Sequence, residues 1–212
     1  MDTAEVAIVR DAEELFARTG HLFAAAAEIS CAAHDLNTWQ ATRPAQPPAE
    51  HPRDVRLRKL YRPGVLLNPS TAQHLASLRA AGADIRITQD DLNETIILDR
   101  RVVILAGDLT AGRRSYSVIS QPDTVAGVAS LFEAAWRGST ALDVYDAQLT
   151  ELRSLAPRVL ELLAGGGKDE SAARTLGLGV RTYRRRVAEL MAALGADSRF
   201  QAGVRARELG LV

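Results

Sequence analysis

The feature that most constrains the fold is a stripe of apolar residues near the C-terminal end of the chain. Its members follow one another at intervals of three and four residues: Val180, Tyr183, Val187, Leu190 and Leu194. That spacing puts all of their side chains on one narrow face of an α-helix. The sequence therefore predicts a helix over residues 180–194 that packs by this face against neighbouring elements.

Three further short helices are expected around it. Apolar residues over about 157–164 indicate a first helix, which a run of glycines ends. A second begins at Asp169, whose carboxylate suits an N-cap. The turn 177–179, Gly-Leu-Gly, offers glycine where a positive φ is needed. A fourth helix is expected over 197–210, so residues 152–212 are predicted to form an all-α four-helix domain with a helix-turn-helix.

The face opposite the apolar stripe is basic, with Arg181, Arg184 and Arg185 outside the stripe. A helix about 10–12 Å wide fits the major groove of B-DNA. Arginine there can donate two hydrogen bonds to guanine O6 and N7, or reach flanking phosphates. The helix that starts at Asp169 would cross the backbone with its N-terminal end facing a phosphate. Double-stranded DNA is the partner that this pattern predicts.

The charge distribution also divides the chain in two. Residues 150–212 carry eleven Lys and Arg against seven Asp and Glu, whereas residues 1–149 carry fifteen against nineteen. A basic module beside an acidic one favours a polyanionic partner for the basic part.

Residues 1–137 alternate between strand and helix patterns, which predicts an α/β domain with a mixed sheet. Strands are expected over 5–9, 27–33, 55–61, 84–88, 94–99, 102–107 and 114–119. Helices are expected after Asp11, after Pro69 and over about 123–136. Residues 40–53 hold four prolines and predict a loop, and residues 138–151 predict a linker or a linking helix.

Composition favours a globular protein over a disordered one, since 47% of residues are hydrophobic and 25% are charged. A run of about 18 apolar residues, which a membrane span requires, is missing from the sequence. The first residues lack the basic and apolar regions of a secretion signal. Cys31 is the single cysteine, so an internal disulfide is excluded. We expect a cytoplasmic location and no membrane partner.

The sequence gives little support for a catalytic site or a metal site. The pair His34-Asp35 allows a proton relay, but a polar pair at a strand end is favoured. Cys31 lies in an apolar strand and is expected to be a core thiol. The pair Asp90-Asp91 allows a phosphoacceptor pocket, but solvated turn residues are favoured because a second acidic cluster is missing. Neither a metal-ligand cluster nor a glycine-rich phosphate loop is present, so no cofactor is expected.

Five aromatic residues are candidates for lining an effector pocket, although core packing is the stronger expectation for each: Trp39, Tyr61, Tyr116, Phe132 and Trp136. A small molecule or a protein effector acting on residues 1–137 stays open.

With these patterns in place, residues 152–212 resemble the LuxR-type, or GerE-type, helix-turn-helix domain. The matching pieces are the spaced leucines of the first helix, Asp169-Glu170-Ser171-Ala172-Ala173, Leu176-Gly177-Leu178, Arg181-Thr182-Tyr183, Leu190, Leu194-Gly195 and Asp197-Ser198-Arg199-Phe200-Gln201-Ala202. The resemblance implies base contacts by Arg184 and Arg185 and phosphate contacts by Arg181 and Thr182. It also implies that Arg199 lies near the DNA backbone and that the fourth helix supplies a dimer face.

Four positions depart from the usual pattern of that family. Ala156 replaces a glutamate, Gly179 a serine, Arg186 a histidine and Ala193 a lysine. These departures affect the base sequence that is read. They leave open the alternative of a protein-interaction regulator whose helix-turn-helix no longer binds DNA.

Residues 1–137 resemble, more weakly, the phospholipase D-like effector domain of TrmB-type regulators. The similarity is carried by residues 93–103, with a strand, an Asp-Arg-Arg turn and a second strand, and by residues 132–136. An active phospholipase D needs a His-x-Lys-x-x-x-x-Asp run, whose histidine is the nucleophile. Before Asp99 this chain has Leu92 and Glu94 at those positions. A regulatory, non-catalytic domain is therefore expected, with an enzyme localised by its C-terminal domain as the alternative.

Together these inferences predict a two-domain transcriptional regulator. It would bind DNA as a homodimer, because two half-sites about one helical turn apart give useful affinity.

Overall fold

The computed structural model describes residues 5–36, 39, 55–110 and 113–212, and the expected loop over 40–53 lies outside them. The chain forms two compact units. The first comprises Met1–Tyr61 and Leu78–Ser139, and the second comprises Arg62–Ser77 and Thr140–Val212.

The first unit is built on a mixed sheet, as predicted. Its strands are β1 (Val6–Val9), β2 (Glu28–Ala33), β3 (Arg56–Tyr61), β4 (Asp84–Ile87), β5 (Thr95–Leu98), β6 (Val102–Thr110) and β7 (Arg113–Ile119). In space they follow the order β1-β7-β6-β5-β2-β3-β4. The pairs β2–β3 and β3–β4 are parallel, while the other neighbours in this order are antiparallel. The strand predictions are confirmed to within a few residues.

The hairpin between β5 and β6 has the expected tight turn. Asp99 and Arg100 adopt φ values of 48° and 55°, and the N–H of Arg101 donates to the carbonyl of Leu98. Asp99 is suited to this conformation because its short polar side chain can bond locally. Its carboxylate accepts the N–H groups of Ala27 and Glu28 at 2.9 and 2.8 Å. The turn is therefore tied to the start of β2.

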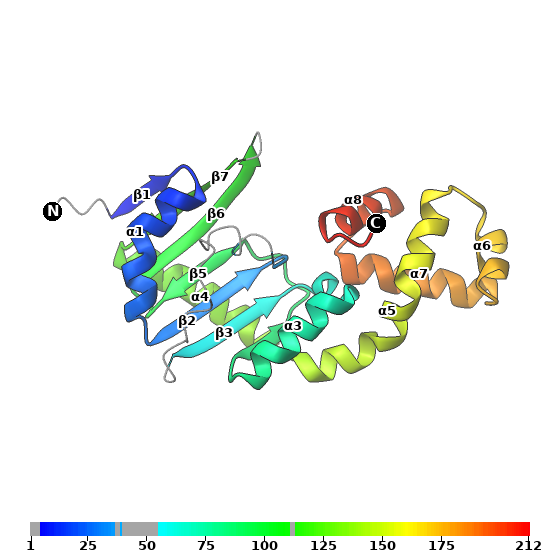
Figure 1. Cartoon of the computed structure of the whole chain (residues 1–212), viewed down its shortest axis with the longest axis horizontal. Coiled ribbons are helices and arrows are strands. Elements are labelled where there is room, and N and C mark those ends of the chain that lie inside the picture. Colours follow the sequence, from blue (N-terminus) through cyan, green and yellow to red (C-terminus); the bar gives the residue numbers. More distant parts are fainter. Residues whose placement is uncertain (1–4, 37–38, 40–54, 111–112) are drawn as a thin grey trace. The chain divides into compact units, whose positions relative to one another are not determined.

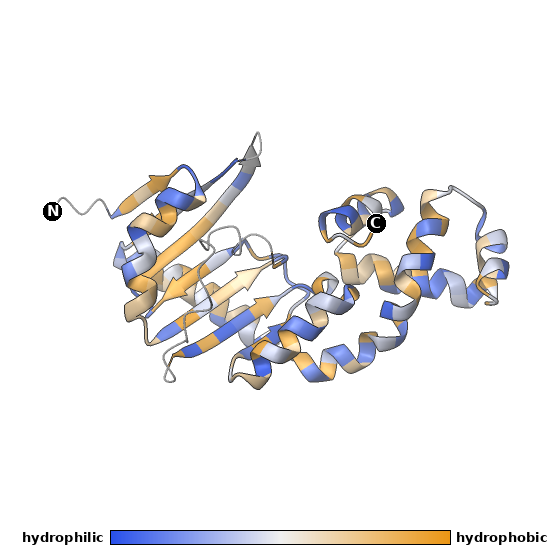
Figure 2. Cartoon of the chain, in the orientation of Figure 1, coloured by the Kyte–Doolittle hydropathy of each residue, from blue (hydrophilic) through white to orange (hydrophobic). Residues whose placement is uncertain are grey.

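Two helices lie on opposite faces of this sheet, α1 (Ala12–Ala25) and α4 (Pro122–Gly138) (Figure 1). The main core lies under α4, where Phe132 packs with Leu60, Ile97 and Val103. The apolar runs of β5 and β6 stand out in Figure 2. Helix α1 begins at the predicted cap, since Asp11 accepts the N–H of Glu14 at 2.9 Å.

A charged residue is buried within the α4 face. Arg58 on β3 is 6% exposed, and its guanidinium lies 5.1 Å from the ring centroids of both Phe132 and Trp136. It donates two hydrogen bonds to the Glu133 carboxylate, at 2.6 and 3.2 Å. Those bonds hold the pKa of Glu133 below its ordinary value. The buried charge of Arg58 is thus paired and hydrogen-bonded, which lowers the free-energy cost of removing it from water.

The second unit is helical. It contains β8 (Thr140–Ala141), α5 (Leu142–Ala164), α6 (Asp169–Thr175), α7 (Val180–Leu194) and α8 (Arg199–Glu208). Helices α6, α7 and α8 coincide with three of the four expected helices. The first expected helix differs, because α5 starts at Leu142 and takes in most of the residues predicted as a linker or a linking helix. Buried Leu149, Leu152 and Val159 continue one apolar face through Pro157, and this packing outweighs the missing N–H of the proline.

A segment from the middle of the chain completes the helical unit. The 3₁₀ helix η1 (Pro63–Leu67) and the start of α3 (Pro69–Ala80) belong with it, although the sequence suggested a domain boundary at 137. Val65, Leu66 and Leu67 are at most 1% exposed, and η1 contacts α5 and α7. The guanidinium of Arg153 on α5 donates to the carbonyl of Leu66. Part of the core under α7 therefore comes from residues 62–77.

Candidate nucleic-acid interface

Helix α7 buries the predicted apolar stripe. Tyr183, Val187, Leu190 and Leu194 are 1%, 4%, 0% and 6% exposed, and Val180 is half-buried. This face packs against α5, α6 and α8. The N-terminal half of α7 is polar and its C-terminal half apolar, as Figure 2 shows. The helix is therefore held by its inner face, while Arg181, Arg184 and Arg185 lie on its exposed face.

A short turn, residues 176–179, joins α6 to α7. Gly177 has a φ of 66°, a conformation that favours glycine, and the N–H of Leu178 donates to the carbonyl of Ala173. Gly179 is the N-cap of α7 at φ −69° and supplies no side-chain cap. The glycine requirement was thus correct for the first glycine of the turn and wrong for the second.

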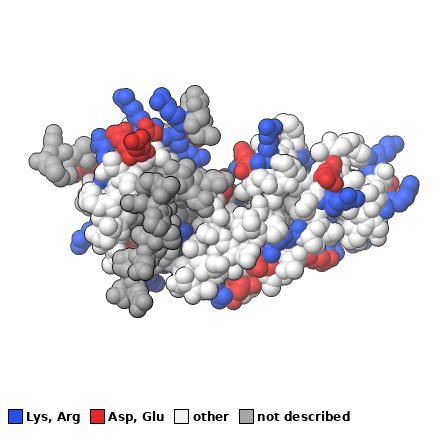
Figure 3. All heavy atoms as spheres, viewed as in Figure 1, with Lys and Arg blue, Asp and Glu red and all other residues white. Residues whose placement is uncertain are grey.

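The predicted DNA-contacting side chains on α7 point outward. Arg181, Arg184 and Arg185 are exposed, and Thr182 is half-buried. Lys and Arg side chains gather over α6 and the adjoining end of α7 in the space-filling view (Figure 3). A helix with this arrangement can place arginines in a groove while its other face stays packed.

Arg186 is the exception on this helix. Its side chain is 12% exposed, and it donates to Glu189 at 2.8 Å and pairs with Glu151 on α5. These two carboxylates raise the pKa of the Arg186 guanidinium. Arg186 therefore ties α7 to α5 and does not face outward.

Asp169 joins three helices. It was expected to cap α6, but the cap residue is Lys168 and Asp169 is the first helical residue. Its two oxygens instead accept hydrogen bonds from Arg184 on α7 and Arg199 on α8, each at 2.8 Å. These bonds, the one from Arg184 foremost, lower the pKa of the Asp169 carboxyl. The N-cap prediction was wrong because two guanidiniums compete successfully for the carboxylate.

The structure thus brings Arg184 and Arg199 together, although they are fifteen residues apart in the sequence. The other three predicted contact residues share α7 with Arg184: Arg181, Thr182 and Arg185. The ion pairs of Asp169 with Arg184 and Arg199 could not be predicted from the sequence. They join different helices, and contacts between helices leave no periodic pattern in the sequence. Asp169 and Glu170 also place two carboxylates in the first turn of α6, where they would repel a phosphate.

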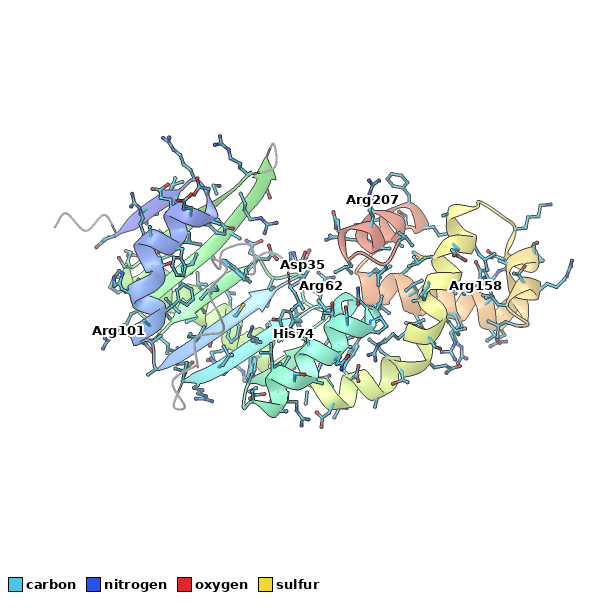
Figure 4. All side chains as sticks on the ribbon, viewed as in Figure 1. Asp35, Arg62, His74, Arg101, Arg158 and Arg207 are labelled. Carbon is cyan, nitrogen blue, oxygen red and sulfur yellow. The ribbon has the colours of Figure 1, made fainter. Side chains whose placement is uncertain are left out.

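Helix α8 begins at the predicted Ser198, whose hydroxyl accepts the N–H of Gln201 at 3.1 Å. It exposes an apolar pair one turn apart, with Phe200 83% and Val204 44% accessible. Arg207 follows on the same helix (Figure 4). Phe200 and Val204 together form an apolar surface on the exposed side of α8.

The polar candidates in the first unit are engaged in local contacts. The ring Nε2 of His34 lies 2.7 Å from the carbonyl oxygen of Leu92, and the backbone N–H of His34 donates to the Glu94 carboxylate. Asp90 bonds the hydroxyl of Thr88 within a turn. Cys31 is buried, and burial raises the pKa of its thiol to about 11. A strand-end polar pair, turn residues and a core thiol were the favoured interpretations, and these contacts agree with them.

Glu94 stands where a phospholipase D has lysine, as the sequence comparison indicated. Its side chain is 7% exposed and pairs with Arg114 on β7. At that position the strand therefore carries a buried ion pair.

The five aromatic candidates are largely core residues. Tyr61, Tyr116 and Phe132 are each 3% exposed and Trp136 is 8% exposed. The rings of Phe132 and Trp136 stack at 5.7 Å, and those of Trp39 and Tyr116 lie 5.9 Å apart. Core packing, the stronger expectation, accounts for the four buried rings.

Two absences hold for the part of the chain that the structure describes. None of its helices has the length and apolar character needed to cross a membrane. Within the same residues, no three metal-ligating side chains form a group that could hold an ion.

The chain matches no known protein-family profile. It is 32% identical over 163 residues to the bialaphos biosynthetic pathway regulatory protein of Streptomyces hygroscopicus. The matched region is 76% of this chain and 63% of that relative, so the chain spans less than two thirds of the relative's length. The chain is therefore similar to a regulatory protein over most of its residues.

Three solved structures are similar in backbone. NucT from Helicobacter pylori gives a TM-score of 0.50 at 8% identity, covering 64% of this chain and 98% of NucT. Nuc, a phospholipase D family member from Salmonella typhimurium, gives 0.49 at 13% identity over 64% and 96%. The archaeal chromatin protein TrmBL2 gives 0.47 at 17% identity over 66% and 55%. At these identities the likeness to NucT concerns the fold alone.

Proposed function

We propose that this chain is a transcriptional regulator that binds double-stranded DNA through α7, as a LuxR-type helix-turn-helix protein. The observation that carries the proposal is the division of α7 into a buried apolar stripe and an exposed arginine face directly after the Gly177 turn. Arg184 and Arg185 are the proposed base contacts, and Arg181, Thr182 and Arg199 the proposed backbone contacts.

Two further observations support it. The relative from Streptomyces hygroscopicus is itself named a regulatory protein. The residues that resemble the LuxR-type pattern fall on α6, α7 and α8, with the short turn between α6 and α7. Helices of this size joined in this way are suited to placing one helix in the major groove.

We also propose that the protein acts as a homodimer and that the first unit regulates it without catalysis. The exposed Phe200 and Val204 on α8 offer an apolar surface for a second copy. In the first unit, the sequence lacks the His-x-Lys-x-x-x-x-Asp run, and Glu94 at the lysine position is paired with Arg114. A small molecule or protein effector would act on this unit.

The proposal is tested by selecting genomic fragments with the purified chain and titrating the recovered duplex in a mobility-shift assay. Arg184→Ala combined with Arg185→Ala should weaken binding of that duplex at least tenfold, because each bidentate base contact is worth about 1–3 kcal/mol. Arg158→Ala is the control, since Arg158 lies on α5 (Figure 4), is 60% exposed and forms a loose ion pair with Glu161 at 3.8 Å. Equal affinities for the double variant and the control would contradict the contact assignment.

A protein-interaction regulator is the second candidate. It is favoured by the inward turn of Arg186 and by the acidic start of α6. The two candidates differ in salt dependence, because phosphate contacts release counterions and give a steep fall of log K with log salt. A flat dependence, with no fragment enriched in the selection, would favour the protein-interaction role.

A further inference from the structure

The carboxylate of Asp169 lies beneath two of the proposed DNA-contacting arginines. Its side chain is 15% exposed, whereas those of Arg184 and Arg199 are 60% and 48% exposed. One oxygen accepts from Arg184 Nε and the other from Arg199 Nη2. Each arginine is therefore held at one point and keeps the rest of its guanidinium accessible.

The point of attachment on Arg184 matters for recognition. Nε is the inner nitrogen of the guanidinium, and the two Nη groups form the outer edge that can pair end-on with guanine O6 and N7. The nearest other carboxylate oxygen to Nη2, from Glu170, lies 3.7 Å away, beyond hydrogen-bond distance. Asp169 thus occupies the edge of Arg184 that an end-on base contact leaves unused.

Holding an arginine in this way has two opposite consequences for DNA binding. A free arginine side chain loses rotamer entropy when it contacts a base, whereas a side chain already oriented by a carboxylate has less of this entropy to lose. A carboxylate close to the interface also repels phosphates, whatever the base sequence. The first effect strengthens binding to the correct sequence, and the second weakens binding to every sequence.

We infer that Asp169 is a positioning residue that sets base specificity, by orienting Arg184 and Arg199 while reducing attraction to non-target DNA. This inference rests on the proposed function of α7. It assigns a role in specificity to an acidic residue at the edge of a basic surface.

The test uses the full chain and two duplexes, the one selected from genomic fragments by the unmodified protein and one of the same composition in scrambled order. Asp169→Asn should lower the ratio of target to scrambled affinity about tenfold, in line with the loss of one ordered bidentate contact. Its affinity for the scrambled duplex should stay equal or rise. Replacing single base pairs of the target should then reveal one position at which the unmodified protein discriminates and the variant does not.

Glu170→Gln is the matched control. It removes the same charge from the neighbouring residue, which makes no hydrogen bond to Arg184 and has a 59% exposed side chain. This variant should keep the affinity ratio. Asp169→Glu adds a second probe, because it retains the charge but moves the carboxylate by one methylene, and it should lower the ratio without raising scrambled affinity.

The outcomes separate this inference from the function on which it rests. If the unmodified chain binds its target and Asp169→Asn keeps the affinity ratio, this inference alone is overturned. The same holds if Asp169→Asn and Glu170→Gln change both affinities by one common factor, since charge would then be the whole effect. If the unmodified chain selects no fragment and binds neither duplex, the proposed function fails and this inference with it.

Discussion

At the residue scale, the buried Arg58 shows how the first unit accommodates a charge inside its core. The guanidinium lies against Phe132 and Trp136 and is bonded by Glu133, with Glu28 at 3.2 Å. The aromatic faces and the two carboxylates replace the water that Arg58 loses on folding. Removing one partner of such a group leaves the other poorly compensated.

Glu133→Gln should therefore reduce the free energy of unfolding by about 2 kcal/mol at neutral pH. Because the pKa of Glu133 is lower in the folded chain than its ordinary 4.5, the pair stabilises the fold above that pH. The contribution is lost as the pH falls through the folded-state pKa. Urea unfolding at a series of pH values should show the difference between wild type and variant narrowing below about pH 4.5. Glu161→Gln, at an exposed pair, should change stability by less than about 0.5 kcal/mol.

The two glycines of the turn before α7 should respond in opposite ways. Gly177→Ala forces a side chain into a φ of 66° and should cost about 1 kcal/mol. Gly179→Ser should stabilise by a few tenths of a kcal/mol, because Gly179 is an extended N-cap without a side-chain cap and with open space around it. Thermal unfolding of both variants is the measurement, and a destabilised Gly179→Ser would contradict the capping argument.

Single residues were predictable from the sequence where one local rule decides them. The inward stripe of α7 follows from helical spacing, and Asp99 and Gly177 follow from turn chemistry. The role of Asp169 did not follow, because its N-cap propensity is local while its two arginine partners are set by how three helices pack. Arg186 likewise turns inward because a partner on α5 is within reach.

At the element scale, periodic patterns predicted the strands and most of the helices. They placed the start of one helix wrongly, at Pro157. The apolar residues over about 157–164 predict a helix that begins near Pro157. In the structure α5 runs through it from Leu142, because a continuous buried face outweighs the loss of one backbone hydrogen bond. The sequence alone cannot weigh that hydrogen bond against packing with residues far along the chain.

Helix α8 carries the prediction about self-association. Phe200→Ser combined with Val204→Ser should shift the chain toward monomer in sedimentation experiments, because the apolar surface proposed to pair with a second copy is removed. Leu131→Ser is the control, since Leu131 on α4 is 66% exposed and lies in the other unit. Retained self-association in the α8 variant would place the homodimer contact elsewhere.

At the scale of the whole molecule, the two units do not follow one another along the chain, because residues 62–77 of the second unit lie between two segments of the first. The α/β character and the mixed sheet could be predicted, since alternating periods of two and 3.6 indicate them directly. The placement of residues 62–77 in the helical unit could not be predicted, because a short apolar run such as Val65-Leu66-Leu67 does not indicate which hydrophobic core it will join. Its position in the sequence, between strands of the sheet, favoured the core of the first unit.

Leu66→Ala tests this organisation. Leu66 is fully buried, so its truncation should destabilise the helical unit by about 3 kcal/mol. Hydrogen exchange should show reduced protection in α5 and α7, more than seventy positions further along the chain. Val144→Ala, at a 51% exposed site on α5, should leave protection unchanged. Protection lost only in the sheet would show that residues 62–77 support the first unit instead.

The placement of residues 62–77 also has a consequence for synthesis on the ribosome. Val65, Leu66 and Leu67 emerge before any part of α5, α7 or α8 has been translated. At about 5–20 residues per second, their partners follow on the order of ten seconds later. For that interval the apolar tripeptide between β3 and β4 lacks the α5 and α7 partners that bury it in the finished chain. The helical unit is therefore completed well after this tripeptide is made, and a chain truncated before Leu142 would lack the helices that bury it.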